Sequence, residues 1–427
     1  MMYFERGAQD EVLAGASLRE ALFTALAALG ERKRVLIVPP DITRLHSQAG
    51  VLTRYAVEYY REKVKTILPA TGTHTPMTEG EIASMFGDVP RHLFLRHDCR
   101  TAAVTVGEAP SDFVRAESGG LIDYAVPFQL NRTILEGGFD LVLSVGQVVP
   151  HEVVGMSNFN KNLFVGTGGF EGINRTHFLG AVYGMERIMG RADNPVRRVL
   201  NYGSDHFLRD VPVVYVQTVV ERAPDGALLI RGLYVGDDTA CFYRAAELSL
   251  KVNVTLLDRP LKKVIVYLDP AEFKSTWVGN KSIYRTRMAI DDGGELIVLA
   301  PGVEKFGEDK GIDALIRRYG YVGSPRVLEL VKQNPDLQKS LSSAAHLIHG
   351  SSEGRFSITY CPGKLTRQEI ESVNFRYGDL AAMLRRYDPA RLVDGFNRLD
   401  DGEEIFYSSQ PALGLWAFKE RFALEPA

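Results

Sequence analysis

Three stretches near the start of the chain share one pattern, a short apolar run followed at once by a polar loop. They are RVLIVPPD (34–41), KTILPATGTH (65–74) and DLVLSVGQVVPH (140–151). Apolar runs of this length, separated by segments with helical spacing, predict buried strands that alternate with helices in a mostly parallel sheet. The chain is therefore expected to have an α/β fold, in which ligands bind at the carboxyl ends of the strands.

Four polar residues come just after these predicted strands, namely Asp41, Arg44, His74 and His151. Because the carboxyl ends of parallel strands meet at one edge of a sheet, we expect the four side chains to share that edge. Each also has an ordinary structural interpretation. Asp41 and Arg44 can form a cap and a surface ion pair, and either histidine can cap a backbone carbonyl in its loop.

The length of 427 residues exceeds what one compact core supports. Strand-like and helix-like segments alternate again after Pro260, with strands expected at 263–269, 295–302 and 355–361. We therefore predict two α/β domains with mostly parallel sheets, residues 1–258 and 259–427. The active site is expected in the cleft between them.

Composition argues against several classes of protein. A net charge of −3 with well-mixed signs disfavours nucleic-acid binding. No apolar run is long enough to cross a bilayer, and the N-terminus lacks the features of a signal peptide. Cys99, Cys241 and Cys361 are far apart, and none belongs to a CxxC pair. This favours reduced thiols in a cytoplasmic protein over disulfides or a cysteine-bound zinc.

Few stretches hold as much potential chemistry as HEVVGMSNFNKNLFVGTGGFEGINRTH (151–177). Lys161 lies ten residues after the first histidine and sixteen before the last, and its amine can carry charge or be acylated. The imidazoles can move protons or bind a soft metal. Glycines let backbone N–H groups approach a phosphate or carboxylate, and Gly168 and Gly169 are the candidates for such cofactor binding.

Ordinary interpretations stay open for these residues too. Lys161 can be a solvated surface charge, and His177 a buried histidine bonded to a neighbour. The HE pair that starts the run resembles a zinc-protease helix, but Gly155 stands where that motif needs its second histidine. In the second half, KSIYRTR (281–287) has three cations in seven residues. Such a segment is usually a solvated face, but beside a cleft it favours an anionic ligand.

Taken together, these residues resemble the nickel-pincer lactate racemase family. The resemblance rests on the order and spacing of residues in three segments, Asp41 with Arg44, then His74, then His151, Lys161 and His177. It spans most of the chain and is strongest from Arg34 to His177. Each motif is weak alone, but the ordered set is hard to obtain by chance.

The resemblance implies a covalently held cofactor. The counterpart of Lys161 is joined through a thioamide to a pyridinium-derived mononucleotide that holds nickel in a planar S–C–S pincer. The counterpart of His177 is the protein-derived nickel ligand. A flat four-coordinate site with soft sulfur and an imidazole suits Ni(II). The implied cofactor is therefore the nickel-pincer nucleotide, and the enzymes that make it are implied partners.

The implied reaction is reversible hydride transfer, which makes the chain a racemase or epimerase of a small 2-hydroxy acid. His74 and His151 are the acid/base pair, and one of them takes the hydroxyl proton while the Cα hydride moves to the cofactor. The resulting 2-keto acid turns and receives the hydride on its other face. The second histidine serves the opposite enantiomer, and no external NAD is required. Asp41 and Arg44 line the site and contact cofactor or substrate.

Two departures from the family pattern bear on the substrate. The loop around the tether reads SNFNKN where the family is richer in Ser-Gly-Gly. Tyr284 matches a cofactor-site tyrosine, but Arg285 stands in place of a glutamine and Met288 in place of a lysine, whose charge Arg287 can supply. We therefore expect Arg44, Arg285 and Arg287 to bind a substrate that is larger than lactate or polyhydroxylated.

Two other functions stay open. A nicotinamide-dependent 2-hydroxy acid oxidoreductase is disfavoured, because no strand runs into GxGxxG with an acidic residue at the usual distance. A non-catalytic homologue that binds a sugar acid would keep the contacts of Arg44 and Arg285 but would need neither His74 nor Lys161. A covalent adduct on Lys161 separates the racemase from both.

Overall fold

The computed structural model describes residues 1–223 and 225–424 of the chain. The chain folds as two compact units. Their segments are Met1–Leu179 with Ile188–Asn253 for unit 1, and Gly180–Arg187 with the residues from Val254 onward for unit 2. The predicted boundary between residues 258 and 259 lies in the loop between β11 (Val254–Leu257) and β12 (Leu261–Tyr267).

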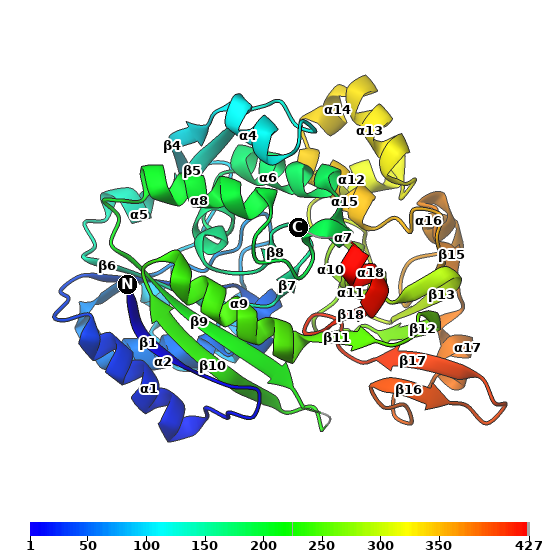
Figure 1. The fold of residues 1–427 in the computed structure, drawn as a ribbon, viewed down its shortest axis with the longest axis horizontal. Helices are drawn as coiled ribbons and strands as arrows, with labels where there is room; N and C mark the ends of the chain where they lie inside the picture. The colour runs from blue at the N-terminus through cyan, green and yellow to red at the C-terminus, as the bar shows by residue number, and fades with distance from the viewer. Residues whose placement is uncertain (224, 425–427) are drawn as a thin grey trace. The chain divides into compact units, whose positions relative to one another are not determined.

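Unit 1 is built on a six-stranded sheet with the order β1-β10-β9-β6-β2-β3. Its strands are β1 (Met2–Gly7), β2 (Val35–Val38), β3 (Val64–Ile67), β6 (Leu141–Gln147), β9 (Val213–Arg222) and β10 (Leu228–Gly236). Strands β3, β2, β6 and β9 run parallel to one another, whereas β10 and β1 pair antiparallel. Figure 1 shows β9 and β10 as two long paired strands with β1 beside β10. The predicted α/β class with a mostly parallel sheet is confirmed.

The central strands of unit 1 are buried along their whole length. All four residues of β2 and all seven of β6 are buried. Strands covered on both faces read as continuous apolar runs rather than as alternating ones, which is why the sequence reveals them.

Helices α1 (Gly15–Ala28), α2 (Ala49–Tyr60) and α3 (Glu79–Phe86) pack with the sheet in the core of unit 1. The buried residues of α1 have the spacing of one helical face and include Leu18, Ala21, Leu22 and Ala25. A capping box begins α3, where Thr78 N donates to Glu81 Oε2 at 2.8 Å and Glu81 N donates to Thr78 Oγ1 at 3.2 Å. Helix α9 (Thr239–Asn253) packs on β9 and β10.

Shorter elements complete this part of the chain. Antiparallel pairs are formed by β4 (Ala103–Ala109) with β5 (Val126–Asn131), and by β7 (Pro150–His151) with β8 (Gly155–Met156). The helical elements are η1 (Ile42–Ser47), η2 (Arg61–Lys63), η3 (Arg91–Leu93), α4 (Ser111–Glu117), α5 (Arg132–Glu136), the π-helix η4 (Asn162–Gly166), α6 (Phe170–Tyr183), α7 (Met185–Ile188) and α8 (Pro195–Phe207).

Unit 2 has its own six-stranded sheet with the order β15-β14-β13-β12-β17-β16. Its strands besides β12 are β13 (Ile290–Ala300), β14 (Ser357–Pro362), β15 (Arg376–Tyr377), β16 (Gly395–Arg398) and β17 (Glu404–Ser408). Its pairs are parallel apart from β16 with β17. Strand β11 pairs in parallel with β18 (Leu415–Phe418). The prediction of a second, mostly parallel α/β sheet is confirmed.

The helices of unit 2 follow the predicted alternation with strands. They are α10 (Thr276–Gly279), α11 (Lys281–Thr286), α12 (Lys310–Tyr319), α13 (Ser324–Gln333), α14 (Pro335–Gln338), α15 (Leu341–His349), α16 (Arg367–Ser372), α17 (Leu380–Arg386) and α18 (Lys419–Leu424). Residues 335–349 form two helices, α14 and α15, and not one, because Ser340 between them has the non-helical angles φ −131° and ψ 62°.

The ordinary interpretation of the cation-rich segment 281–287, a solvated face, is wrong. The segment forms helix α11 and the residue that follows it, and its cations are buried. Lys281, Arg285 and Arg287 are 9%, 0% and 3% exposed. Buried cations need partners, and those of Arg287 are described below.

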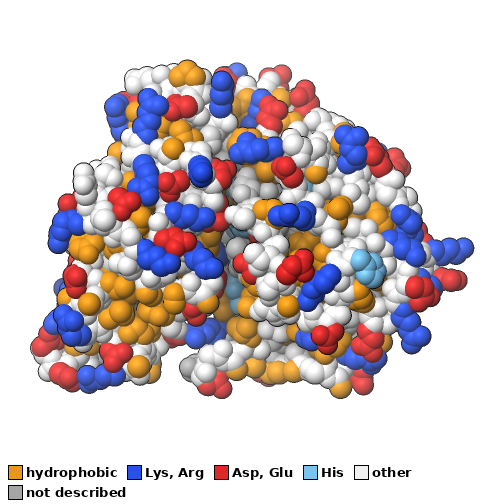
Figure 2. Space-filling model, turned by 180° about the vertical axis from the view of Figure 1, so that it is seen from behind, with side chains coloured by type: hydrophobic (Ala, Val, Ile, Leu, Met, Phe, Trp, Pro, Cys, Tyr) orange, Lys and Arg blue, Asp and Glu red, His pale blue; other side chains and the backbone are white. Residues whose placement is uncertain are grey.

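Cys99, Cys241 and Cys361 are free thiols. Within residues 1–223 and 225–424 we find no helix with the length and hydropathy of a membrane span. Positive and negative side chains are interspersed over the face shown in Figure 2, as the mixed charge of the sequence predicts.

Candidate active site

The loops that follow β2, β3 and β6 come together at the carboxyl ends of these adjacent strands. Gly72 N, after β3, donates to Gly166 O, after β6, at 2.8 Å. Asn162 Nδ2 donates to Val38 O and to Ser144 Oγ, each at 3.0 Å, and so ties the same segment to β2 and β6. The loops therefore share one edge of the sheet, as the sequence predicts.

Asp41 and His74, from the first two of these loops, form a hydrogen-bonded pair with 2.7 Å between His74 Nδ1 and Asp41 Oδ2. The other oxygen of Asp41 caps η1 by accepting from Thr43 N at 3.1 Å and from Thr43 Oγ1 at 2.6 Å. Burial raises the pKa of the Asp41 carboxyl, but the charge and hydrogen bond of His74, helped by Thr43 and Arg44, outweigh burial and lower it. An ionised Asp41 places the ring proton on Nδ1 of His74, so Nε2 is the nitrogen that exchanges protons with a ligand.

Two buried polar atoms beside this pair have no partner among the described residues. One is Nη1 of Arg44, in η1, and the other is Oγ1 of Thr71. Thr71 lines a cavity of about 340 Å³. Pro76 and Met77, which follow His74 in the same loop, line it as well. A buried donor without a partner is costly unless a ligand satisfies it. Both atoms are therefore candidates for a hydrogen bond to a ligand.

His151 ends β7 and is 4% exposed. Its Nδ1 accepts a hydrogen bond from Val153 N at 3.1 Å and lies 3.6 Å from Oε2 of Glu152. A ring nitrogen that accepts a backbone N–H carries no proton, so the neutral ring has its proton on Nε2. The two histidines thus have opposite tautomers: the neutral His74 ring accepts at Nε2, and the neutral His151 ring donates there.

The backbone of Lys161, at the start of η4, is anchored on both sides. Before it, Asn160 Nδ2 donates to Asn201 Oδ1 at 2.8 Å and to Ser204 Oγ at 3.0 Å. After it, Asn162 makes the two bonds described above. Both asparagines are buried, whereas the lysine side chain is only half-buried. A π-helix such as η4 is rare and is frequent at functional sites.

The amine of Lys161 lies among the charged groups of this edge. Burial and then the charge of Arg44 lower the pKa of Lys161 to about 8, while the charges of Glu152 and Asp41 oppose that shift. These charges come from the loop that holds Asp41 and from the turn that holds His151. A lysine with this pKa has an appreciable neutral fraction near neutral pH, and the neutral amine is the form that is acylated. A fully solvated lysine, the ordinary interpretation, is not what the structure shows.

His177 lies on α6, where its Nδ1 donates to Ile173 O, one turn earlier, at 2.8 Å. This bond orients the ring and leaves the lone pair of the neutral ring on Nε2, which suits a metal ligand. His206 on α8 makes the same kind of bond to Tyr202 O at 2.8 Å. The bond alone is therefore compatible with a metal role and does not establish one.

Gly168 and Gly169 are explained by close contacts within the chain. A Cβ on Gly168 would meet the carbonyl oxygen of Phe164 at 1.8 Å, and a Cβ on Gly169 would meet Oε1 of Gln129 at 2.3 Å. Only glycine fits such positions without a shift of the neighbouring chain. Contact of these glycines with a cofactor stays a prediction.

Tyr284 and Arg285, which the resemblance assigns to the ligand, are buried on α11 of unit 2. The hydroxyl of Tyr284 bonds to Nδ1 of His346 at 2.8 Å, and the hydroxyl of Tyr321 bonds to Nε2 of the same ring at 2.9 Å. Burial lowers the pKa of His346 to about 3, so this ring is neutral. Arg285 Nη1 lies 3.4 Å from Gly414 O. Ligand contacts of Tyr284 and Arg285 stay predictions.

Arg287 already has partners within unit 2. Its Nε donates to Glu186 Oε1 at 2.5 Å, and its Nη1 donates to the carbonyls of His349 and Ser351 at 3.3 and 3.1 Å. These contacts neutralise and satisfy the cation without a substrate. The predicted substrate contact of Arg287 is untested, and its bonds point to a structural role.

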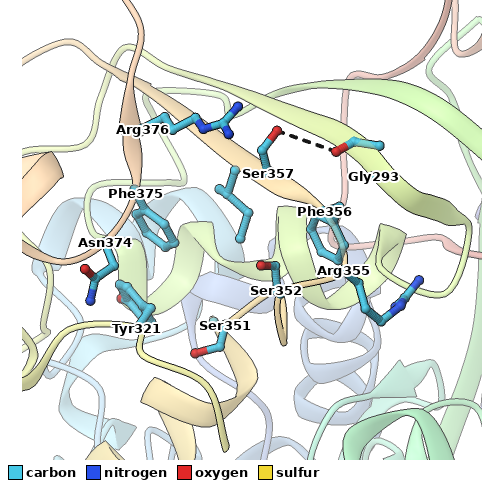
Figure 3. Close-up of a pocket in the computed structure, with 14 residues that line it drawn as sticks. Gly293, Tyr321, Ser351, Ser352, Arg355, Phe356, Ser357, Asn374, Phe375 and Arg376 are labelled. Carbon is cyan, nitrogen blue, oxygen red and sulfur yellow. Dashed lines mark hydrogen bonds between the residues drawn. The ribbon is translucent and has the colours of Figure 1, made fainter. Parts of the chain in front are cut away.

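A second cavity, of about 430 Å³, lies in unit 2 and contains none of the residues singled out from the sequence. It is lined mainly by residues 350–358 and 374–376, and Figure 3 shows Arg355 and Arg376 on opposite sides of it. Arg355 donates to Asp292 Oδ1 at 2.9 Å and to two backbone carbonyls. The candidate site therefore belongs to unit 1.

Nowhere in the described part of the chain do three or more His, Cys, Asp or Glu side chains gather as a metal site. The predicted nickel site takes one ligand from the protein and the others from the cofactor, so it does not require such a group.

Four residues of the site were not found from the sequence. Glu152, Asn160 and Asn162 are neighbours of predicted residues, and a polar pair flanking a lysine before an apolar run was a signal that could have been used. Arg197, on α8, approaches the Lys161 loop only in the folded chain, and nothing local marks it.

Comparisons with known proteins agree with this architecture. Residues 16–188 match the family model of the lactate racemase N-terminal domain. A crystal structure of a protein from Thermotoga maritima has a TM-score of 0.83 at 24% identity, covering 96% of this chain and 100% of that one. The lactate racemase apoprotein from Thermoanaerobacterium thermosaccharolyticum has a TM-score of 0.64 at 16% identity, covering 96% and 91%. No curated protein matched the sequence.

Proposed function

We propose that this chain, whose residues 16–188 match the family model of the lactate racemase N-terminal domain, is an isomerase that racemises or epimerises a 2-hydroxy acid. One observation carries the proposal. Loops after three adjacent parallel strands bring the Asp41–His74 pair, Arg44, His151 and the Lys161 amine to one edge of the sheet. Acid/base groups, an anion-binding cation and an acylable amine are what such a reaction needs in one place.

The residues present fit the nickel-pincer nucleotide of the family. Lys161 would hold it covalently, because the lowered pKa of its amine favours the reactive neutral form. His177 would offer Nε2 to the nickel, because Nδ1 is bonded to Ile173 O. The buried Nη1 of Arg44, which lacks a protein partner, suits an anionic oxygen. When bound, the cofactor supplies an acceptor for the Cα hydride of the substrate and a donor for its return.

The side chains of the site perform the proton transfers. Arg44 binds the carboxylate of the substrate. Nε2 of His74 takes the hydroxyl proton, since the ionised Asp41 stabilises the imidazolium that forms, a contribution of about 10²–10⁴-fold in rate. Nε2–H of His151 donates a hydrogen bond to the substrate oxygen. To transfer a proton, this ring must first take up a second proton on Nδ1 in place of the bond from Val153 N, and Glu152, 3.6 Å from Nδ1, stabilises that form.

We propose a substrate that is larger than lactate or polyhydroxylated. Arg285 and Met288 replace the polar residues that the family pattern has at these positions, which changes the groups available to a substrate. The cavity of about 340 Å³ beside the His74 loop offers additional room in unit 1. We further propose a cytoplasmic location, where the enzymes that make the cofactor would act as partners.

The test is to produce the chain together with the cofactor-making enzymes and to measure the mass of the peptide that contains Lys161. An adduct is expected on Lys161 and not on the exposed Lys33, and Lys161→Ala should remove both adduct and activity. A panel of 2-hydroxy acids is then followed by loss of optical rotation. In D₂O, retention of the Cα hydrogen in the racemised product indicates hydride transfer, whereas deuterium uptake indicates proton abstraction.

Three results would count against the proposal. Activity that depends on added NAD supports an ordinary oxidoreductase. Sugar-acid binding without an adduct or turnover supports a non-catalytic homologue. Racemisation that survives Lys161→Ala contradicts the tether.

A further inference from the structure

Arg197 is a fully buried cation without a carboxylate partner. It lies in the first turn of α8 and its side chain is 0% exposed. No Asp or Glu among the described residues pairs with it or shifts its pKa. Burying an arginine without a counter-ion is unfavourable unless hydrogen bonds compensate.

The side-chain hydrogen bonds of Arg197 all go to one short segment. Nη2 donates to Met156 O at 2.6 Å, and Nη1 donates to Asn158 O at 3.5 Å and to Asn160 Oδ1. The guanidinium also lies over the ring of Phe242, 4.2 Å from its centre. The segment 156–160 leads directly into Lys161.

That segment has an unfavourable backbone conformation. Asn158 and Phe159 are consecutive residues with φ of 65° and 59°, in the left-handed region. An aromatic residue is unfavourable in this region and persists only where its surroundings enforce it. The Phe159 ring is fixed by Tyr215 and Phe242, with centroid distances of 4.2 and 5.4 Å. These aromatic contacts fix the ring but not the polar backbone and side-chain atoms of the segment, and those atoms are held by the hydrogen bonds of Arg197.

We propose that Arg197 is a positioning residue for Lys161, whose hydrogen bonds hold segment 156–160 in the strained conformation that presents the lysine amine for acylation. This inference rests on the proposed tethering role of Lys161. The positive charge of Arg197 also favours acylation of Lys161. Together with Arg44 it favours the neutral form of the amine, whereas Glu152 and Asp41 favour the charged form.

Two variants separate the charge of Arg197 from its geometry. Arg197→Met fills similar space but provides neither hydrogen bonds nor charge. Arg197→Lys keeps the charge but lacks the planar fork that reaches several acceptors at once. The neighbouring Arg198 is the matched control, because its exposed side chain pairs with Asp193 at 2.7 Å and with Glu117 at 3.3 Å.

The experiment uses the full chain without cofactor and the acetylating reagent N-hydroxysuccinimidyl acetate over a range of pH. Peptide mass spectrometry follows acetylation of Lys161 relative to Lys33. We expect Arg197→Met to lower the relative rate at neutral pH by about three- to tenfold and to move the pH midpoint of Lys161 upward. Arg197→Lys should lower the rate while keeping the midpoint, and Arg198→Met should change neither.

Wild-type rate and midpoint in folded Arg197→Met and Arg197→Lys proteins would overturn the proposal. Circular dichroism reports folding, and if the methionine variant does not fold, the lysine variant alone decides. Because no cofactor is used, the result is independent of the proposed reaction. A missing adduct in co-produced wild-type protein counts against that reaction, while altered acetylation in the Arg197 variants still supports the positioning role.

Discussion

His74 and His151 are the same residue type at the same edge of one sheet, yet their hydrogen bonds prepare them for different chemistry. A carboxylate holds the proton on Nδ1 of His74, and a backbone N–H excludes it from Nδ1 of His151. A neutral His74 ring can therefore accept a proton at Nε2, whereas a neutral His151 ring donates a hydrogen bond there. His151 can give up a proton only from its imidazolium form, because loss of the proton from a neutral ring would leave an imidazolate.

Asp41 is the residue that sets this difference, so we expect Asp41→Asn to lower kcat of the loaded enzyme by about 10²–10⁴-fold. The amide oxygen can still cap Thr43, but it cannot stabilise the imidazolium of His74. Steady-state racemisation measures the effect. Asp140→Asn is the control, because Asp140 accepts from Lys33 N and Arg34 N outside the site, at 2.6 and 2.9 Å. An unchanged kcat in the folded Asp41→Asn enzyme would contradict the assignment.

Lys161 should reduce the stability of the chain without cofactor. Its pKa is lowered from 10.5 to about 8 by burial and by Arg44. Below pH 8 the amine is charged in both folded and unfolded states, and the cost of burying the charge is fully present. Between pH 8 and 10.5 the folded state gives up its proton first, so stability rises with pH.

We therefore expect Lys161→Met to be more stable than the wild type by ~1–3 kcal/mol below pH 8. The difference should shrink as pH rises from about 8 towards 10.5. Urea unfolding of the cofactor-free proteins at several pH values measures it, with Lys33→Met as the exposed control. A constant difference across this range would show that the amine is not titrating as described.

At the residue scale, the sequence identified side chains but not their states. Asp41, His74, His151 and Lys161 were found because they follow apolar strands or stand in a distinctive run. Tautomers and pKa values depend on partners such as Val153 N, whose position only the folded chain defines. The spacing of residues along a strand and loop can be read from the sequence. The direction of a hydrogen bond is determined only when the chain folds and its partners come together.

At the scale of elements, a strand or helix could be predicted from the sequence only where its burial produces a local pattern of apolar residues. Strands β2 and β6 are buried on both faces and read as apolar runs. Strand β1 is an edge strand of mixed polarity, and its partner β10 lies more than two hundred residues further along the chain. The π-helix η4 also has no sequence signature, and the bonds that Asn162 makes to β2 and β6 form only in the folded chain.

Helix α6 presents His177, and a metal role for this residue can be separated from a structural one. We expect His177→Ala to lose nickel while the mass adduct on Lys161 remains, because the tether and the metal ligand are different side chains. Metal analysis and peptide mass spectrometry of the co-produced protein measure the two quantities. His206→Ala is the control, since His206 makes the same bond to the carbonyl one turn earlier. Nickel retained by His177→Ala would exclude the assigned ligand.

For the whole molecule, the sequence indicated two α/β domains but described them as consecutive stretches. In the structure the chain leaves unit 1 at Gly180, contributes eight residues to unit 2 and returns at Ile188. A linear pattern of strands and helices does not reveal such an excursion, because it depends on contacts between residues distant in the sequence. The ion pair of Glu186 with Arg287 is one of these contacts.

Burial raises the pKa of Glu186, but the charge of Arg287 and further hydrogen bonds outweigh it and lower the pKa. The pair is therefore ionised, and removing one partner leaves a buried charge. We expect Arg287→Met to destabilise the protein by roughly 3–5 kcal/mol, and the double variant with Glu186→Gln to recover part of that loss. The exposed Arg318, which pairs with Asp336 at 2.9 Å, is the control, with an expected cost below about 1 kcal/mol.

Urea unfolding measures these differences, and the KM of the loaded enzyme decides between the two roles of Arg287. If the residue holds Gly180–Arg187 in unit 2, stability falls and the double variant restores it. If Arg287 instead binds the substrate, as the sequence predicts, Arg287→Met raises KM at nearly unchanged stability and Glu186→Gln brings no recovery. The bonds of Arg287 to Glu186 and to two backbone carbonyls favour the first outcome.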